Sequence, residues 1–113
     1  MKNKLIRYSF NEKSKYIIQE GKEIYDNIKK NWSIYFKNDK PLNIELACGY
    51  GEHTTHFSIN NFKNNYIGVD IKGARIYKGA KKLEEIKSSN GVFLRTYIEN
   101  IDDFFEKKSV MDH

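Results

Sequence analysis

The chain of 113 residues has one cysteine, one proline and no long apolar run. Because a disulfide needs two cysteines, Cys48 excludes an intramolecular bridge and agrees with a reducing compartment. No stretch reaches the roughly 18 apolar residues of a membrane span, and the lysine-rich start lacks the apolar segment of a secretory signal. We therefore expect a cytoplasmic protein with no membrane partner.

Candidate metal ligands are also few. His53 and His56 share a helix face at i, i+3, but no cysteine or carboxylate cluster stands beside them at ligand spacing. We therefore expect surface histidines and no metal.

Positive charge, in contrast, is in excess. A net charge of +5 and a pI near 9.2 favour a polyanionic partner such as RNA. The abundance of Asn, Lys and Ile is also what an A+T-rich genome encodes by mutational drift. Charge alone therefore leaves RNA binding and drift equally open.

The stretch from Ile44 to Glu52 is the centre of the sequence. A short apolar run predicts a buried strand, and a turn with Gly49 and Gly51 follows before a helix that opens at His53. Glycines let the backbone approach a ligand closely, and the helix start offers free N–H groups. This order of strand, loop and helix is typical of a nucleotide site.

A second predicted strand, 66–69, ends at Asp70. That acid lies 70 − 51 = 19 residues after the second loop glycine, close to the roughly 20 at which a Rossmann-type acid meets a ribose hydroxyl. The ends of two strands should therefore converge on one nucleoside.

The loop itself disfavours NAD. Thr54 stands where a dinucleotide fingerprint has its third glycine. Glu45 lies inside the apolar strand, where a carboxylate is costly unless a fixed partner compensates it. S-adenosylmethionine has an α-amino group and a sulfonium charge that would do so. A dehydrogenase is therefore only a distant alternative.

The segment 67–80, IGVDIKGARIYKGA, indicates one family of proteins. It resembles the G(V/I)D-IKGAR-(W/Y)-KGA segment of bacterial tRNA (guanine-N7-)-methyltransferases, and Phe93 to Glu99 follows at that family's spacing. The resemblance covers essentially the whole chain but only the amino-terminal half of such an enzyme. It implies methyl transfer from S-adenosylmethionine to N7 of the variable-loop guanine at position 46 of tRNA.

The resemblance also implies roles for single residues. Glu45, Gly49 and Gly51 would hold the methionine end of the cofactor, Asp70 the ribose, and Ile98 with Glu99 the adenine side. Lys72 and Arg75 would lie beside the cofactor or contact tRNA phosphates, with a solvated charged face as an equally open alternative. No catalytic residue is assigned, because N7 has a lone pair with no proton to remove, so that catalysis can rest on positioning.

The implied architecture is an α/β, Rossmann-like class I S-adenosylmethionine-dependent methyltransferase fold, incomplete, with its first three parallel strands and an amino-terminal helical lead-in. We expect an arm and short helices over 1–40 and the first half of the cofactor domain over 41–113. In that half, crossover helices cover 53–61 and 74–88, and the third strand is 92–96. The first strand then becomes a sheet edge.

Smaller elements complete the prediction. We expect a mobile arm over 1–11, short helices within 16–30, and an aromatic cluster at 32–36 that covers one end of the sheet. A short helix should span 101–108, and 109–113 should begin a fourth strand.

Two positions depart from the family pattern. Ala47 replaces a glycine, which fits if the position keeps a β conformation. Tyr50 replaces a common lysine, so that a positive contact is lost. Two functional hypotheses remain: an incomplete copy of the enzyme, whose other half is encoded downstream or in a partner chain, or a non-catalytic remnant or RNA/nucleotide-binding module.

Overall fold

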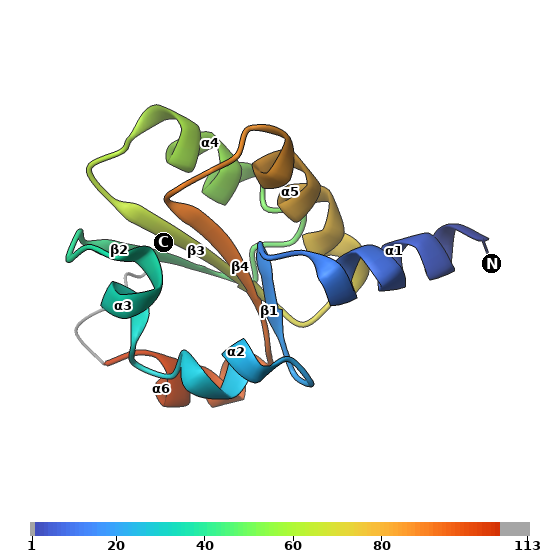
Figure 1. Cartoon of the computed structure of the whole chain (residues 1–113), viewed down its shortest axis with the longest axis horizontal. Coiled ribbons are helices and arrows are strands. Elements are labelled where there is room, and N and C mark those ends of the chain that lie inside the picture. Colours follow the sequence, from blue (N-terminus) through green and yellow to red (C-terminus); the bar gives the residue numbers. More distant parts are fainter. Residues whose placement is uncertain (1, 107–113) are drawn as a thin grey trace.

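Four parallel strands form one sheet in the computed structural model, which describes residues 2–106 (Figure 1). The strands lie in the order β1-β4-β3-β2, and their bounds are β1 Ile17–Gln19, β2 Leu42–Leu46, β3 Asn65–Asp70 and β4 Gly91–Arg95. Ile44 pairs with Ile67, and Val69 pairs with Leu94. The predicted α/β class and its three parallel strands, now β2 to β4, are confirmed.

Helices cover both faces of this sheet (Figure 1). On one face lie α4 (Glu52–Asn60) and α5 (Gly73–Glu85), and α1 (Lys2–Lys13) packs beside α5. On the other face lie α2 (Glu23–Asn27), α3 (Trp32–Phe36) and α6 (Ile101–Phe104). The result is a three-layer α/β/α arrangement in which the crossover helices α4 and α5 have the predicted positions.

Aromatic side chains seal the face covered by α2, α3 and α6. The Trp32 ring stacks on Phe105 with centroids 5.1 Å apart, and its indole N–H donates to the Phe104 carbonyl at 2.8 Å. Trp32 and Phe36 are buried, whereas Ile34 is 73% exposed. The prediction that these aromatic residues pack against the sheet is confirmed for the rings of Trp32 and Phe36.

The opposite face is organised around one phenyl ring. Phe93 of β4 is fully buried among Ile76, Ala80 and Leu83. Three glycines contact its ring, and a Cβ on any of them would overlap it: Gly51, Gly68 and Gly79. Close packing of the sheet against α4 and α5 therefore depends on these missing side chains.

Two predictions for the amino-terminal region were wrong. The segment 1–11, expected to be a mobile arm, is mostly helix α1. The sequence of this helix shows no amphipathic period, and its apolar residues Leu5 and Ile6 are exposed. Residues Ile17–Gln19, expected in a short helix, form β1, because Ile17 and Ile18 are buried when they pair with the free side of β4. Strand β1 therefore belongs to the same sheet as β2, β3 and β4. The division of the chain into two parts at residue 40 stays a prediction.

After β4, the helical elements follow one another in the order that the sequence predicts. A 3-10 turn, η1 (Ile98–Asn100), precedes α6, which is shorter than the helix predicted over 101–108. The strand expected over 109–113 lies outside the described residues. Within 2–106, no helix is both long and apolar enough to cross a bilayer.

In the described part of the chain, four residues other than glycine have a left-handed backbone: Lys30, Lys37, Ala47 and Lys87. Lys87, at φ +53°, closes α5. Its N–H donates to the Glu84 carbonyl at 3.2 Å, and the Ser88 N–H donates to the Leu83 carbonyl at 3.0 Å. These are the two hydrogen bonds of a Schellman motif, in which glycine is the usual residue.

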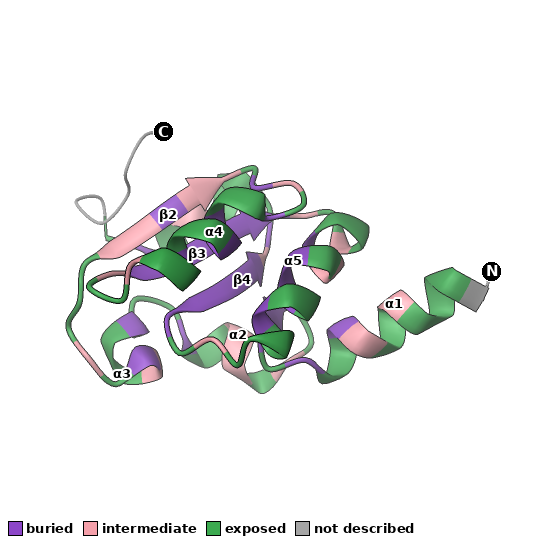
Figure 2. Ribbon diagram, turned by 90° about the horizontal axis from the view of Figure 1, so that it is seen from above, coloured by how far each residue is buried: buried purple, intermediate pink, exposed green. Residues whose placement is uncertain are grey.

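Strand β2 is an edge. In the described part of the chain it pairs with β3 on one side and with no strand on the other. Figure 2 shows that β2 is largely half-buried, whereas β3 and β4 are buried along most of their length. The predicted edge position of this strand is confirmed.

Candidate functional site

The carboxyl ends of β2, β3 and β4 meet at one edge of the sheet, where open parallel sheets bind ligands. Backbone hydrogen bonds fix them there: the Cys48 N–H donates to the Val69 carbonyl at 2.9 Å, and the Thr96 N–H donates to the Asp70 carbonyl at 3.1 Å. The loops that leave these strands therefore lie next to one another.

The two loop glycines have different surroundings. Both have positive φ values, +58° at Gly49 and +72° at Gly51. A Cβ at Gly51 would strike the Phe93 ring, whereas a Cβ at Gly49 would meet no atom within 4 Å. Gly51 therefore serves the packing of the core, and Gly49 leaves open space in which a ligand can approach the backbone.

Asp70 links the loop to the start of α5. Its Oδ2 accepts the Gly49 N–H at 2.9 Å and its Oδ1 accepts the Lys72 N–H at 2.9 Å. The residue is 6% exposed. Each carboxylate oxygen has a second lone pair, so that acceptor capacity remains beside the open space at Gly49.

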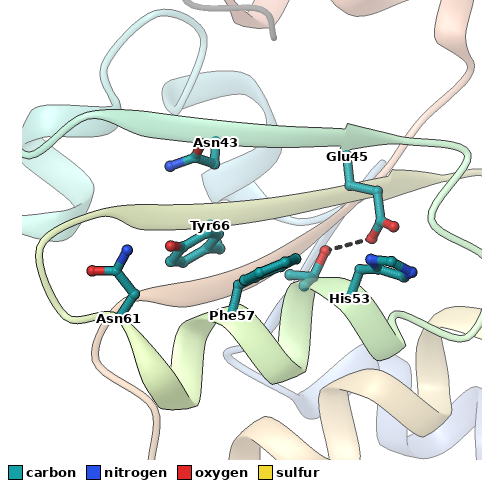
Figure 3. Close-up of a pocket in the computed structure, with 7 residues that line it drawn as sticks. Asn43, Glu45, His53, Phe57, Asn61 and Tyr66 are labelled. Carbon is teal, nitrogen blue, oxygen red and sulfur yellow. Dashed lines mark hydrogen bonds between the residues drawn. The ribbon is translucent and has the colours of Figure 1, made fainter. Parts of the chain in front are cut away.

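Glu45 has a protein partner that sequence reasoning missed. Its Oε1 accepts the Thr54 hydroxyl at 2.8 Å, so that this hydrogen bond joins β2 to α4; it is the dashed line that ends at Glu45 in Figure 3. Thr54, which the sequence presented as a missing glycine, thus supplies part of the compensation that the carboxylate needs. The structure places Glu45 on the α4 face of β2, beside the base of the glycine loop.

A cavity of about 620 Å³ extends from Glu45 along the groove between β2 and α4. Figure 3 shows His53 at the same end as Glu45, and the rings of Phe57 and Tyr66 further along. These two rings stack with centroids 6.1 Å apart. Phe57 was not among the predicted site residues, although its spacing of four from His53 puts both on one face of α4.

The other predicted site residues lie at the same edge of the sheet but are exposed. Ile98 and Glu99 form the turn η1, directly after Tyr97 and the hydrogen-bonded Thr96. Lys72 precedes α5, and Arg75 lies in its first turn. The structure therefore brings Gly49, Asp70 and the Lys72 backbone into contact and arranges the remaining side chains around them.

One expectation about the loop needs correction. Ala47 has φ +55°, which is left-handed rather than β, because the chain turns immediately after β2. The loss of a positive contact at Tyr50 stays a prediction, and another cation is near this ring. The Lys78 ammonium of α5 lies 5.0 Å from the centroid of the Tyr50 ring.

Cys48, in the same loop, is buried. Burial raises the pKa of its thiol far above the ordinary value, and the nearby carboxylates of Glu45 and Asp70 raise it further. The thiol is therefore protonated at neutral pH and is a poor nucleophile.

The family model described as "Putative methyltransferase" matches residues 39–112. This chain belongs to that methyltransferase family. It is 42% identical over 109 residues to a tRNA (guanine-N(7)-)-methyltransferase of Cytophaga hutchinsonii, covering 96% of this chain and 49% of that protein. It is 44% identical over 116 residues to the one of Christiangramia forsetii, covering 98% and 52%. The resemblance seen in the sequence is confirmed.

This methyltransferase-family chain thus spans about half the length of the curated relatives it matches. Its fold is similar to a crystal structure of the plantazolicin methyltransferase BamL, which contains SAH, with a TM-score of 0.50 and 20% identity over 97% of this chain and 40% of that one. That likeness concerns the fold, and it agrees with a partial Rossmann-like methyltransferase domain.

Proposed function

We propose that this chain is the cofactor-binding half of a tRNA (guanine-N7-)-methyltransferase that acts in the cytoplasm on the variable-loop guanine at position 46. The names of its relatives and the family match support this proposal. The structural observation that carries it is the open space at Gly49 beside the Asp70 carboxylate. In this proposal S-adenosylmethionine is the cofactor, and its sulfonium supplies the methyl group.

The residues at the sheet edge fit such a cofactor. Asp70 accepts hydrogen bonds from the ribose hydroxyls, Gly49 lets the backbone of the loop approach the methionine portion, and Gly51 keeps the loop packed on Phe93. Glu45, with one oxygen engaged by Thr54, attracts the α-amino group electrostatically.

The exposed residues have supporting roles in the same proposal. Ile98 and Glu99, on the turn after β4, face the adenine side of the cofactor. Lys72 and Arg75, at the start of α5, attract tRNA phosphates.

The proposed chemistry requires little from the protein beyond positioning. The bound cofactor would supply a sulfonium methyl group. The guanine N7 lone pair would form the new N–C bond as the C–S bond breaks, and that electron pair would stay on the sulfur of the departing SAH. N7 has no proton to lose, so that no general base is needed. The role of the loop is to hold the methyl donor in line with N7, which can contribute several kcal/mol through proximity and orientation.

A binding experiment with the whole chain tests the cofactor site. We expect SAH to bind the unmodified chain in isothermal titration calorimetry, and Gly49→Ala to abolish that binding. The reason is steric, because the new methyl group would enter the open space that the ligand needs. The backbone strain at positive φ should lower the free energy of unfolding by only about 1 kcal/mol.

Gly21→Ala is the matched control. Gly21 also has a positive φ, +97°, and open space around its Cβ position, but it lies in the turn after β1. It should lose at least as much stability, because φ +97° lies beyond the left-handed range of L-residues, and it should retain SAH binding. If both variants bind SAH as the unmodified chain does, Gly49 is not part of a cofactor site.

A further inference from the structure

A second cavity, of about 440 Å³, lies between α1 and α5 and reaches the glycine loop. Arg7 of α1 and Arg75 and Lys78 of α5 line it together with the rings of Tyr50 and Tyr77. We call it the α1–α5 groove.

Specific contacts hold the groove in shape. The Asn11 side-chain amide donates to the Gly73 carbonyl at 3.1 Å, and the Phe10 and Tyr77 rings meet edge to face with centroids 5.1 Å apart. Asn11 is buried although it is polar. Helix α1 is therefore fixed against the start of α5, and Arg7 is carried to the same cavity as Arg75.

Among residues 2–106, no side chain neutralises the positive charges in the groove. No carboxylate of this part of the chain lines the cavity. Within residues 2–106 one ion pair has an N–O distance of 4.0 Å or less, namely Lys82 with Glu85 at 4.0 Å. It lies further along α5 and involves none of the three groove cations. Three adjacent cations repel one another, so that the groove favours an anionic occupant.

An exposed aromatic ring lies where the groove meets the loop. Tyr50, between the two loop glycines, is 52% exposed, and Lys78 stands over its ring. Cations that track phosphates next to an aromatic ring that can stack a base are the combination by which proteins bind single-stranded nucleic acid. A simple phosphate would use the cations but not the ring.

We propose that the α1–α5 groove binds an RNA strand, with Arg7 and Arg75 on successive phosphates and an unstacked base against Tyr50. This inference rests on the proposed function and adds to it the path by which RNA reaches the loop. In this arrangement α1 is part of the RNA-binding surface, and the strand arrives next to Gly49.

Binding of a fluorescently labelled tRNA transcript to the whole chain, measured by anisotropy at several salt concentrations, tests the groove. Arg7→Gln combined with Arg75→Gln should weaken binding about tenfold or more and should reduce the slope of log K against log salt by about two. The control combines Lys40→Gln with Lys63→Gln, which removes the same charge at exposed sites outside the groove. It should change the affinity less than about twofold.

Substitutions at Tyr50 measure the contribution of base stacking to tRNA binding separately from that of charge. Tyr50→Ala should weaken tRNA binding about fivefold or more, because it removes the ring on which the base stacks, whereas Tyr50→Phe keeps the ring and should retain binding. Inorganic phosphate should compete only weakly. Equal losses in the two double variants, equal affinities of Tyr50→Ala and Tyr50→Phe, or competition by phosphate alone at similar concentrations would each overturn the proposal.

Measuring SAH binding to the unmodified chain distinguishes a failure of the proposed function from a failure of the groove assignment. A chain that binds tRNA through the groove but not SAH contradicts the proposed function and leaves the groove assignment standing. A chain that binds SAH but not tRNA overturns the groove assignment.

Discussion

Ala47 concentrates backbone strain at the point where the chain leaves β2. Its φ of +55° brings the Cβ atom close to its own backbone, which costs an L-residue about 1–2 kcal/mol relative to ordinary conformations. Glycine has no such penalty but loses more entropy on folding. The strain lies in the same loop as Gly49, next to the candidate cofactor site.

We therefore expect Ala47→Gly to raise the free energy of unfolding by about 0.5–1 kcal/mol in urea denaturation. Ala74→Gly is the control, since Ala74 lies in the first turn of α5 and glycine there should lower stability by about 0.5–1 kcal/mol. The two substitutions remove the same methyl group with opposite expected signs. A loss of stability in both would mean that Ala47 is not strained.

At the scale of secondary structure, β1 is the element whose role is least obvious. It has three residues, and it extends the sheet beyond β4 with Ile17 opposite Phe93 and Ile18 opposite Leu94. Ile18 is fully buried on the face that α2, α3 and α6 cover. The short strand thereby anchors the amino-terminal region to the sheet.

Ile18→Ala should lower the free energy of unfolding by about 2–4 kcal/mol, because the removed methyl groups leave a cavity in a packed core. Ile34→Ala, at a residue that is 73% exposed, should change it by less than about 0.5 kcal/mol. Chemical denaturation monitored by Trp32 fluorescence measures both. Similar small effects would place Ile18 outside the core.

The sequence carried enough information to predict β2, β3, β4 and the two crossover helices, because each strand is an apolar run and α5 has a clear helical period at Ile76, Ala80 and Leu83. Three residues are too few to show a period, so that β1 was missed. The Glu45–Thr54 hydrogen bond and the α1–α5 groove join residues on different elements, and such pairings do not appear in local sequence patterns.

For the whole molecule, the feature that bears most on contacts between copies of the chain is the edge strand β2, the last strand of the sheet in residues 2–106. In the described residues, its outer side presents backbone groups that no other strand pairs, flanked by half-buried side chains. Exposed edges of this kind promote pairing between chains. The net charge of +5 opposes close approach but acts over the whole surface and weakens with salt.

We expect sedimentation velocity to show association that increases with protein and salt concentration. Asn43→Lys, which puts a charge on the edge strand itself, should suppress it. Asn60→Lys, which adds the same charge on the exposed surface of α4, should have a much smaller effect. If both variants reduce association equally, net charge rather than the β2 edge controls it.

The Schellman motif at the end of α5 ties the stability of the chain to ionic strength. Lys87 occupies the left-handed position that glycine usually takes, at a backbone cost that salt does not change. A cationic residue at the carboxyl end of a helix is attracted by the negative end of the helix dipole, by about 0.3–1 kcal/mol, and salt screens this attraction. Dissolved ions thus remove the compensation and leave the strain, so that this helix end is held most firmly in dilute buffer.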